Sequence, residues 1–158
     1  MGFVLDRVAS DVKHYGPFVC SVCQNLASLD VVVTPCSHPF CLACLQVWMQ
    51  KRIAEDLNCR CPACRQDLEA PQQEDGKTLV IENRPIRAQS LETAQPLAFN
   101  VLKNVQVKCR SGVSTVDAEE CYWTGDYAEL QKHQVEHKLK SVRSPSMSNT
   151  GHATANKD

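Results

Sequence analysis

The sequence lacks the features that direct a chain into a membrane, out of the cell or onto nucleic acid. Its 158 residues carry 17 Lys and Arg against 18 Asp and Glu, so no basic excess points to nucleic acid or to anionic lipid. No stretch approaches the roughly 18 consecutive apolar residues of a membrane span. The N-terminus is no signal peptide, because Asp6 and Arg7 interrupt its apolar run. We therefore expect an intracellular, cytoplasmic protein with no membrane partner, and leave a nuclear location open.

Cysteine, in contrast, is abundant, with ten residues in a chain of this length. In a secreted protein such a count would indicate disulfides. In a reducing compartment, clustered cysteines are more often zinc ligands, because zinc prefers thiolate and imidazole donors in a tetrahedral arrangement. The sequence shows no internal repeat, but its Cys and His residues fall into two groups. These groups predict two separate zinc-binding modules.

The first group contains three C-x2-C pairs and one C-x-H pair. Its candidate ligands are Cys20, Cys23, Cys36, His38, Cys41, Cys44, Cys61 and Cys64. A C-x2-C pair lets one turn of backbone present two sulfurs to one metal, and eight ligands suffice for two closed zinc sites. The segment that contains them is too small to fold on a hydrophobic core alone. Two structural zincs, at about 10–16 kcal/mol of apparent binding free energy each, would supply the deficit.

The segments CSVC, CSHPFCLAC and CPAC resemble the RING finger family, and the resemblance covers residues 20–68. That family interleaves its ligands in a cross-brace. Carried over, site one would be Cys20, Cys23, Cys41 and Cys44, and site two would be Cys36, His38, Cys61 and Cys64. Because neither site is local in sequence, the loss of one ligand should unfold both halves.

The resemblance also implies a partner surface. In RING ligases, a groove for the ubiquitin-conjugating enzyme is formed by three positions: between the first two cysteines, on the helix after the sixth ligand, and at the Pro of the last C-P-x-C. The corresponding residues here are Val22, Trp48 and Pro62. An exposed apolar groove is typical of a partner site. By spacing alone Trp48 could equally be a core aromatic, because it lies one position off an apolar i, i+4 stripe of Leu45, Met49, Ile53 and Leu57.

Arg65 follows the last ligand directly, where active RING ligases often carry Arg or Lys. It resembles the residue that hydrogen-bonds both the conjugating enzyme and its attached ubiquitin. A guanidinium suits that role because its fork presents several fixed donors; the alternative is an ordinary solvated Arg. The resemblance implies an enzyme that positions a ubiquitin thioester for attack by a substrate lysine. The implied partners are a ubiquitin-conjugating enzyme, ubiquitin and a protein substrate.

Cys59 does not fit the ligand spacing, because only Arg60 separates it from Cys61. It could compete for site two. We interpret it as a spare thiol, since the segment from Cys61 to Cys64 keeps the two-residue spacing and a turn-favouring Pro. The alternative is a catalytic nucleophile that forms a thioester. That role requires a positioned base and a further domain, and neither is visible in the sequence.

The second group is smaller and more widely spaced. Its candidate ligands are Cys109, Cys121, His133 and His137. The two histidines are four apart and so share one face of a helix, while Asp126 with Glu129 makes a capping-box-like start to that helix. A strand, a hairpin and then a helix would form one ββα-like finger around a third zinc. The alternative is a helix with two surface histidines and no metal.

The stretch CYWTGDYAELQKHQVEH resembles a TRAF-type zinc finger. In that family a RING is followed by a linker helix, a V-x-C segment and such fingers, and PLAFNVLKNVQVKC fits this order. The resemblance therefore extends from about residue 20 to residue 138. Two departures are that His137 stands where the family usually has Cys, and that the first ligand gap is longer. No coiled coil or receptor-binding sandwich follows, so receptor-adaptor functions are not implied.

The sequence predicts a small zinc-stabilised α+β protein with a RING cross-brace, a linker helix, one ββα-like finger and a disordered C-terminal tail. The expected divisions are an N-terminal helix in 1–19 (a candidate homodimer contact over 3–14), the RING finger 20–68, a linker 69–104 with a short strand in TLVIE and a helix over 90–104, the TRAF-like finger 105–140 and the tail 141–158. The predicted function is that of a RING-type ubiquitin-protein ligase. The alternative is a non-catalytic zinc-finger adaptor. A DNA-binding finger is disfavoured because Asp126, Glu129 and Glu136 on its helix would repel phosphate.

Overall fold

The computed structural model of the chain describes residues 2–71, 78–109 and 121–142, with Val12 and residues 137–142 described by their backbone alone. Its helices are η1 (Leu5–Arg7), α1 (Val12–Tyr15), η2 (Gly16–Phe18), α2 (Leu42–Ala54), α3 (Leu91–Ala94), α4 (Pro96–Lys103), η3 (Tyr127–Glu129) and α5 (Leu130–Val142). Its strands are β1 (Val31–Val33), β2 (Pro39–Cys41), β3 (Thr78–Ile81), β4 (Arg84–Arg87), β5 (Gln89–Ser90), β6 (Gln106–Lys108) and β7 (Thr124–Asp126). No helix in the described ranges is both long and apolar enough to cross a membrane.

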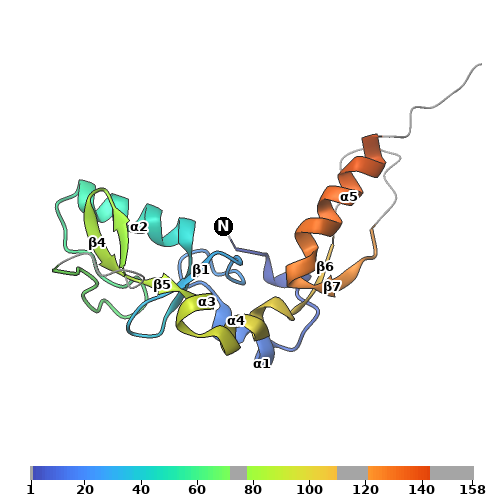
Figure 1. The fold of residues 1–158 in the computed structure, drawn as a ribbon, viewed down its shortest axis with the longest axis horizontal. Coiled ribbons are helices and arrows are strands. Elements are labelled where there is room, and N and C mark those ends of the chain that lie inside the picture. The colour runs from blue at the N-terminus through green and yellow to red at the C-terminus, as the bar shows by residue number, and fades with distance from the viewer. Residues whose placement is uncertain (1, 72–77, 110–120, 143–158) are drawn as a thin grey trace, which may run out of the picture.

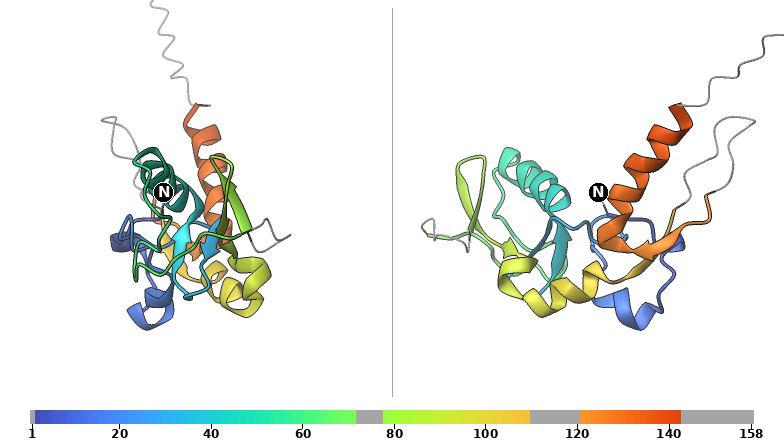
Figure 2. Two further views of the ribbon diagram at one scale, coloured as in Figure 1. Left: turned by 90° about the vertical axis from the view of Figure 1, so that its left-hand side faces the viewer. Right: turned by 45° about the vertical axis from the view of Figure 1, so that its right-hand side comes forward.

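The molecule is elongated, with helix α2 towards one end and helix α5 towards the other (Figure 1). The short helices α3, α4 and α1 lie along the lower edge of the molecule in this view, between its two ends. The right-hand view of Figure 2 shows the same arrangement, and in both of its views α5 rises away from the rest of the chain. The predicted fold class, a small zinc-binding α+β protein, is confirmed.

The first sheet, ordered β2-β1-β5, carries the middle of the first Cys/His group. Strand β1 is three consecutive valines, whose branched side chains suit a strand, and all three are buried. It pairs antiparallel with β2, which places Val31 opposite Cys41. Because α2 begins directly after Cys41, one sulfur lies at the end of a strand and Cys44 lies in the first turn of the helix.

A β-hairpin, β3 and β4, covers one side of the RING-like part. Its two turn residues, Glu82 and Asn83, have φ of 47° and 61°, and such left-handed pairs form the tight turns that match strand twist. At the turn end of the hairpin, Arg84 lies 3.5 Å from the Asp56 carboxylate and 3.4 Å from the Glu69 carboxylate. The hairpin is thereby tied both to the end of α2 and to the segment after the last cysteine pair.

The predicted linker helix over 90–104 is instead two helices, α3 and α4. The break is at Gln95, whose backbone leaves the helical region at φ −145° and ψ 71°. The cause is Pro96, which disfavours the helical region for the residue before it. Pro96 itself begins α4, where a missing N–H costs nothing.

The predicted N-terminal helix over residues 3–14 is wrong as a single element. The structure has the 3-10 turn η1 and the one-turn helix α1, with extended backbone between them. The reason is tertiary: Val8 forms a β-bridge with Val107, and the Ala9 N–H donates to the Gln106 carbonyl at 2.7 Å. This pairing across about a hundred residues overrides the weak helical spacing of three valines.

The second module is a hairpin and a helix, as the ββα expectation stated. Strand β6 pairs antiparallel with β7, and Val107 lies opposite Gly125. The turn η3 then leads into α5, which includes the first two residues of the predicted tail; residues 143–158 lie outside the described part of the chain. Buried residues of both modules, from Phe18 to Leu130, form one continuous apolar cluster.

Candidate metal centres and partner surface

The first cluster joins two cysteine pairs that are distant in sequence. Its four sulfurs, from Cys20, Cys23, Cys41 and Cys44, all lie within 4.8 Å of one another. Cys20 and Cys23 come from a knuckle that is closed by hydrogen bonds from the Cys20 N–H to the Asn25 carbonyl and from the Gln24 N–H to the Cys20 carbonyl, both at 2.8 Å. The four cysteines of this cluster are those that the RING resemblance implied for site one.

The electrostatics of this cluster favour a bound cation. The Cys41 thiol donates a hydrogen bond to the Cys20 sulfur, which lowers the pKa of Cys20 and raises the pKa of Cys41. Burial, followed by the negative charge of Cys20, raises the pKa of Cys44 to about 11. Four crowded sulfurs therefore cannot all ionise alone, whereas a divalent ion at their centre would let them do so.

The second cluster comprises the other two pairs of the first group. The ligand atoms of Cys36, His38, Cys61 and Cys64 lie within 4.8 Å of one another, and the His38 Nδ1 is 3.8 Å from the Cys61 sulfur. Burial raises the pKa of Cys61 to about 11, while the Gln66 N–H lowers the pKa of the exposed Cys64. Because pairs one and three form one cluster and pairs two and four the other, the ligand order is that of a cross-brace.

The third cluster lies in the second module. The ligand atoms of Cys109, Cys121 and His133 lie within 4.8 Å of one another, with the Cys121 sulfur 3.3 Å from the His133 Nε2. A backbone hydrogen bond helps to hold the cluster together, since the Cys109 N–H donates to the Trp123 carbonyl at 2.9 Å. The side chain of the fourth predicted ligand, His137, lies outside the described residues.

The three clusters offer the donors that zinc prefers. Among the described residues, every grouped ligand atom is a cysteine sulfur or a histidine nitrogen, and no carboxylate of these residues takes part. This soft and borderline set fits zinc rather than calcium or magnesium, which prefer oxygen. Two of the clusters supply four protein ligands each, so a bound zinc there would be closed to water and would act as a scaffold. The prediction that the chain binds zinc is confirmed.

An aromatic stack supports the third cluster. The Trp123 indole lies parallel to the His133 imidazole, with ring centroids 4.4 Å apart and an interplanar angle of 9°. The indole also covers Gly125, where an added Cβ would meet the Trp123 Cζ2 at 2.5 Å. Trp123 and Gly125 lie in the stretch CYWTGDYAELQKHQVEH, but no role was predicted for them. Their spacing was the available signal, because Gly two residues after Trp leaves room for the ring.

Cys59 is not part of the second cluster. It is fully buried, and its N–H donates to the Glu69 carboxylate at 3.1 Å. Burial, and then the charge of Glu69, raises the pKa of the Cys59 thiol. A catalytic thiol needs access and a lowered pKa. The geometry therefore favours a buried structural cysteine and argues against a thioester-forming nucleophile.

The three predicted partner residues lie on the RING-like part at different elements. Val22 is at the tip of the first knuckle and is 38% exposed, Trp48 is on α2 and is 37% exposed, and Pro62 is partly exposed in the last knuckle. The Trp48 indole N–H donates to the Arg60 carbonyl at 3.2 Å, which ties α2 to the chain two residues before Pro62. Trp48 is thus a surface aromatic with a fixed orientation, and the alternative that it lies in the core is wrong.

Arg65 is exposed and has a left-handed backbone, with φ of 63°. Its N–H closes the last knuckle by donating to the Cys61 carbonyl at 2.9 Å. A non-glycine residue in this region is held at a cost of about 1–2 kcal/mol. Within the described part of the chain, no hydrogen bond or ion pair holds its guanidinium.

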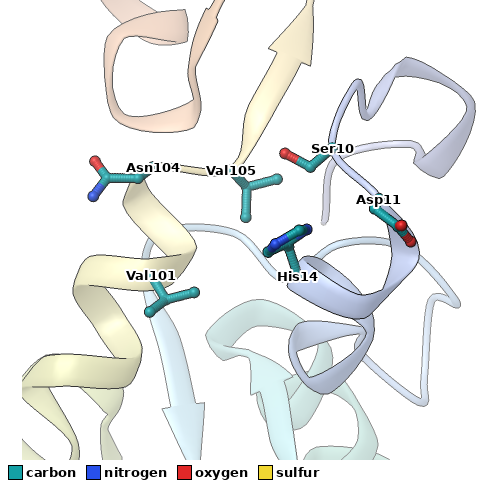
Figure 3. A pocket seen from close by; sticks show the side chains of 6 residues that line it. All are labelled: Ser10, Asp11, His14, Val101, Asn104 and Val105. Carbon is teal, nitrogen blue, oxygen red and sulfur yellow. The ribbon is translucent and has the colours of Figure 1, made fainter.

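A separate cavity of about 380 Å³ lies between α1 and the end of α4 (Figure 3). It is lined by Ser10, Asp11, His14, Val101, Asn104 and Val105. None of these residues is a predicted zinc ligand or part of the predicted groove for the conjugating enzyme, but Ser10, Asp11 and His14 belong to the candidate homodimer contact. The cavity marks the place where the N-terminal segment meets the linker helix.

The interleaved clusters and the element order define a RING-type zinc finger, and residues 20–62 match the family model with that description. The chain is similar to E3 ubiquitin-protein ligase CHFR of Mus musculus, with 38% identity over 62 residues, which is 39% of this chain and 9% of that protein. It is also similar to the DNA repair protein RAD5 of Candida glabrata, with 37% identity over 60 residues (37% of this chain and 5% of that protein), and to the RING finger protein PSH1 of Saccharomyces cerevisiae, with 36% identity over 50 residues (32% and 12%). The matched stretch thus spans at most about an eighth of these relatives. The TRAF-type likeness of the second finger stays a prediction.

Proposed function

We propose that the chain is a RING-type ubiquitin-protein ligase. It docks a ubiquitin-conjugating enzyme charged with ubiquitin and promotes transfer to a lysine of a protein substrate, with no covalent intermediate of its own. The observation that carries this proposal is the combination of two closed ligand clusters with an exposed partner surface beside them. The RING finger of a relative named as an E3 ubiquitin-protein ligase, CHFR, supports the same reading.

The docking surface consists of Val22, Trp48 and Pro62. Each is apolar and partly exposed, and each lies on an element that a ligand cluster holds in place. Apolar side chains held rigid before contact bind at lower entropic cost. The hydrogen bond from Trp48 to the Arg60 carbonyl adds to this preorganisation, because it fixes the indole between α2 and the last knuckle.

Arg65 is the residue to which we assign the chemical contribution. It follows the last ligand, and its guanidinium is free among the described residues to donate to a bound carrier and to ubiquitin. Such donors restrict a flexible thioester to an attack-ready geometry, which is the main source of rate in a reaction without a protein nucleophile. The left-handed backbone of Arg65 belongs to the knuckle itself, because Gln24 has a φ of 57° at the same place in the first knuckle.

Zinc, when bound, supplies only rigidity at the two RING clusters. The chain's own residues bind the carrier, orient the thioester and leave the attacking amine to the substrate. The second finger and the linker helices would extend this platform or recruit the substrate. We place the protein in the cytoplasm as part of the proposal, since its cysteines suit a reducing compartment.

The test is a discharge assay with a panel of charged conjugating enzymes. Val22→Ala and Arg65→Ala should each lose transfer by about tenfold or more while bound zinc stays unchanged. Val47→Ala is the matched control, because Val47 is exposed on the same helix but is not part of the docking surface. Absence of transfer with every carrier tested would favour the alternative, a zinc-finger adaptor without activity.

A further inference from the structure

The N-terminal residues 2–10 lie against both zinc-binding modules. At one end, the Phe3 N–H donates to the Leu26 carbonyl at 2.8 Å, and the Leu26 N–H donates back to the Phe3 carbonyl at 2.9 Å. At the other end, the Ala9 N–H donates to the Gln106 carbonyl at 2.7 Å. We call residues 2–10 the strap. Its two anchors are more than 75 residues apart in the sequence, so the strap joins parts of the chain that have no local connection.

The first anchor lies on the knuckle that carries Val22. Leu26 is fully buried and forms β-bridges on two sides, with Phe3 and with Val19. The residue before it, Asn25, accepts the hydrogen bond from the Cys20 N–H that closes the knuckle. One edge of the knuckle is therefore held by the strap and the other by the residues that precede Cys20.

Gly2 makes this anchor possible. An added Cβ at Gly2 would meet the Leu26 carbonyl oxygen at 2.3 Å and the Leu26 carbonyl carbon at 3.1 Å. Both atoms belong to the backbone and cannot rotate away. A side chain at this position therefore pushes the strap off the knuckle, whereas at Gly16 an added Cβ meets nothing within 4 Å.

The second anchor lies on the strand that leads to the third cluster. Val8 forms a bridge with the fully buried Val107, and the Gln106 N–H donates to the Ser10 hydroxyl at 2.8 Å. Strand β6 ends at Lys108, and the next residue is the ligand Cys109. The Phe3 ring adds a direct contact with the second module, because its centroid lies 5.5 Å from that of the buried Tyr127.

We propose that the strap positions the Val22 knuckle for the conjugating enzyme and couples it to the third zinc cluster, with Gly2 and Phe3 as its positioning residues. The choice of the conjugating enzyme as the partner rests on the proposed ligase function. The contacts of the strap do not depend on that function. Val22 lies in a knuckle of a few residues, which gains order from each edge that is paired. When the strap is displaced, the RING clusters keep their ligands, and the tip that carries Val22 loses one of its two edges.

The first experiment is amide hydrogen exchange on the full zinc-loaded chain. Gly2→Ala should speed exchange at Leu26, Gln24 and Cys20 by about tenfold or more, because local opening governs these amides. Gly16→Ala is the control with the same atoms added in open space. Unchanged exchange in Gly2→Ala, or equal changes in both variants, would refute the proposal that the strap orders the Val22 knuckle.

A second pair of variants separates positioning from general damage. Phe3→Ala should raise the KM for the charged conjugating enzyme by about threefold or more and leave kcat within about twofold, because docking rather than chemistry is affected. Phe3→Leu should restore most of the KM, and Val4→Ala, the neighbouring exposed residue, should change nothing. A fall in kcat with KM unchanged would contradict a positioning role.

The coupling to the third cluster has its own test. Cys109→Ser removes a ligand there, and faster exchange at Leu26 and Gln24 is expected although both lie in the other module. Loss of protection confined to β6 and β7 would show that the strap does not transmit the state of the finger. If the wild-type chain transfers no ubiquitin, the ligase proposal fails, while the exchange results still decide whether the strap exists.

Discussion

Substitution of Arg65 by glycine separates the structural role of this residue from its proposed chemical role. The φ of 63° at Arg65 is in the left-handed region, and glycine adopts it without the cost of about 1–2 kcal/mol that a side chain incurs. Glycine in turn loses about 0.5–1 kcal/mol through the greater freedom of the unfolded chain. The difference predicts that Arg65→Gly is as stable as the wild type or up to about 1.5 kcal/mol more stable.

The same substitution removes the guanidinium. A hydrogen bond to a charged donor contributes about 1.5–3 kcal/mol, so its loss from the transition state should slow transfer by about tenfold to a hundredfold. Arg65→Gly should therefore be at least as stable as the wild type, keep its zinc and be nearly inactive. Arg65→Lys keeps a charge without the planar fork and should retain part of the activity.

Two measurements check this prediction on the same protein preparation. Chemical denaturation with zinc quantification reports the stability of the knuckle, and single-turnover discharge of a charged conjugating enzyme reports transfer. A variant that loses zinc together with activity would show that Arg65 is structural. A variant that discharges within about twofold of the wild type would refute the assigned chemistry.

Three further predictions follow from individual contacts. Trp48→Phe keeps an aromatic ring, smaller than the indole, but loses the N–H bond to the Arg60 carbonyl, so carrier affinity should fall by about threefold to tenfold, and by more in Trp48→Ala; wild-type affinity of Trp48→Phe in titration calorimetry would contradict a role for the N–H. Gly125→Ala places a Cβ 2.5 Å from the Trp123 indole and should displace the indole from His133. The amount of bound zinc should then fall from three equivalents to two at limiting metal, and Gly16→Ala is the control. Cys59→Ala removes a buried sulfur and should cost about 1–2 kcal/mol of stability in denaturant titration, yet leave transfer unchanged; lost transfer in a folded, zinc-loaded variant would restore the thioester alternative.

The fold class could be predicted because the spacing and order of the metal ligands can be read in the sequence. A C-x2-C pair needs a particular turn of backbone, and the order of three such pairs and one C-x-H pair allows few closed arrangements. The structure brings together the same two sets of four that the resemblance implied. The element order of the finger also followed from local signals, since β6, β7 and α5 each lie near their own ligands.

What the sequence did not reveal depends on contacts between distant residues. The short strand expected in TLVIE is β3, but its partner β4 contains Pro85, which weakens any local strand signal. The turn between them needs two left-handed residues without glycine, at Glu82 and Asn83. Likewise, the position of Trp48 beside an apolar stripe left core and surface equally open, and only the Arg60 carbonyl on another segment settles its orientation.

The N-terminal segment shows most clearly why local pattern was insufficient. Three valines at i, i+4 and i+8 satisfy a helical period, but a short isolated helix is marginal in water. Pairing with Leu26 and with Gln106 offers backbone hydrogen bonds to buried neighbours. A segment with weak propensity adopts whichever conformation its neighbours can pair with, and those neighbours are invisible to a local window.

The zinc modules are small, and this determines how the chain must be stabilised. Each alone buries few large side chains, and the buried residues form a single cluster that crosses the predicted boundary at 104/105. Leu102 and Val107, on either side of that boundary, are both fully buried. Zinc can fix the local shape of each knuckle, but it cannot orient one module relative to the other, because no ligand cluster of the described residues contains members of both. That orientation therefore depends on apolar packing along α4 and on the strap, and these are the places where a substitution is expected to disturb the proposed ubiquitin transfer without removing a single zinc ligand.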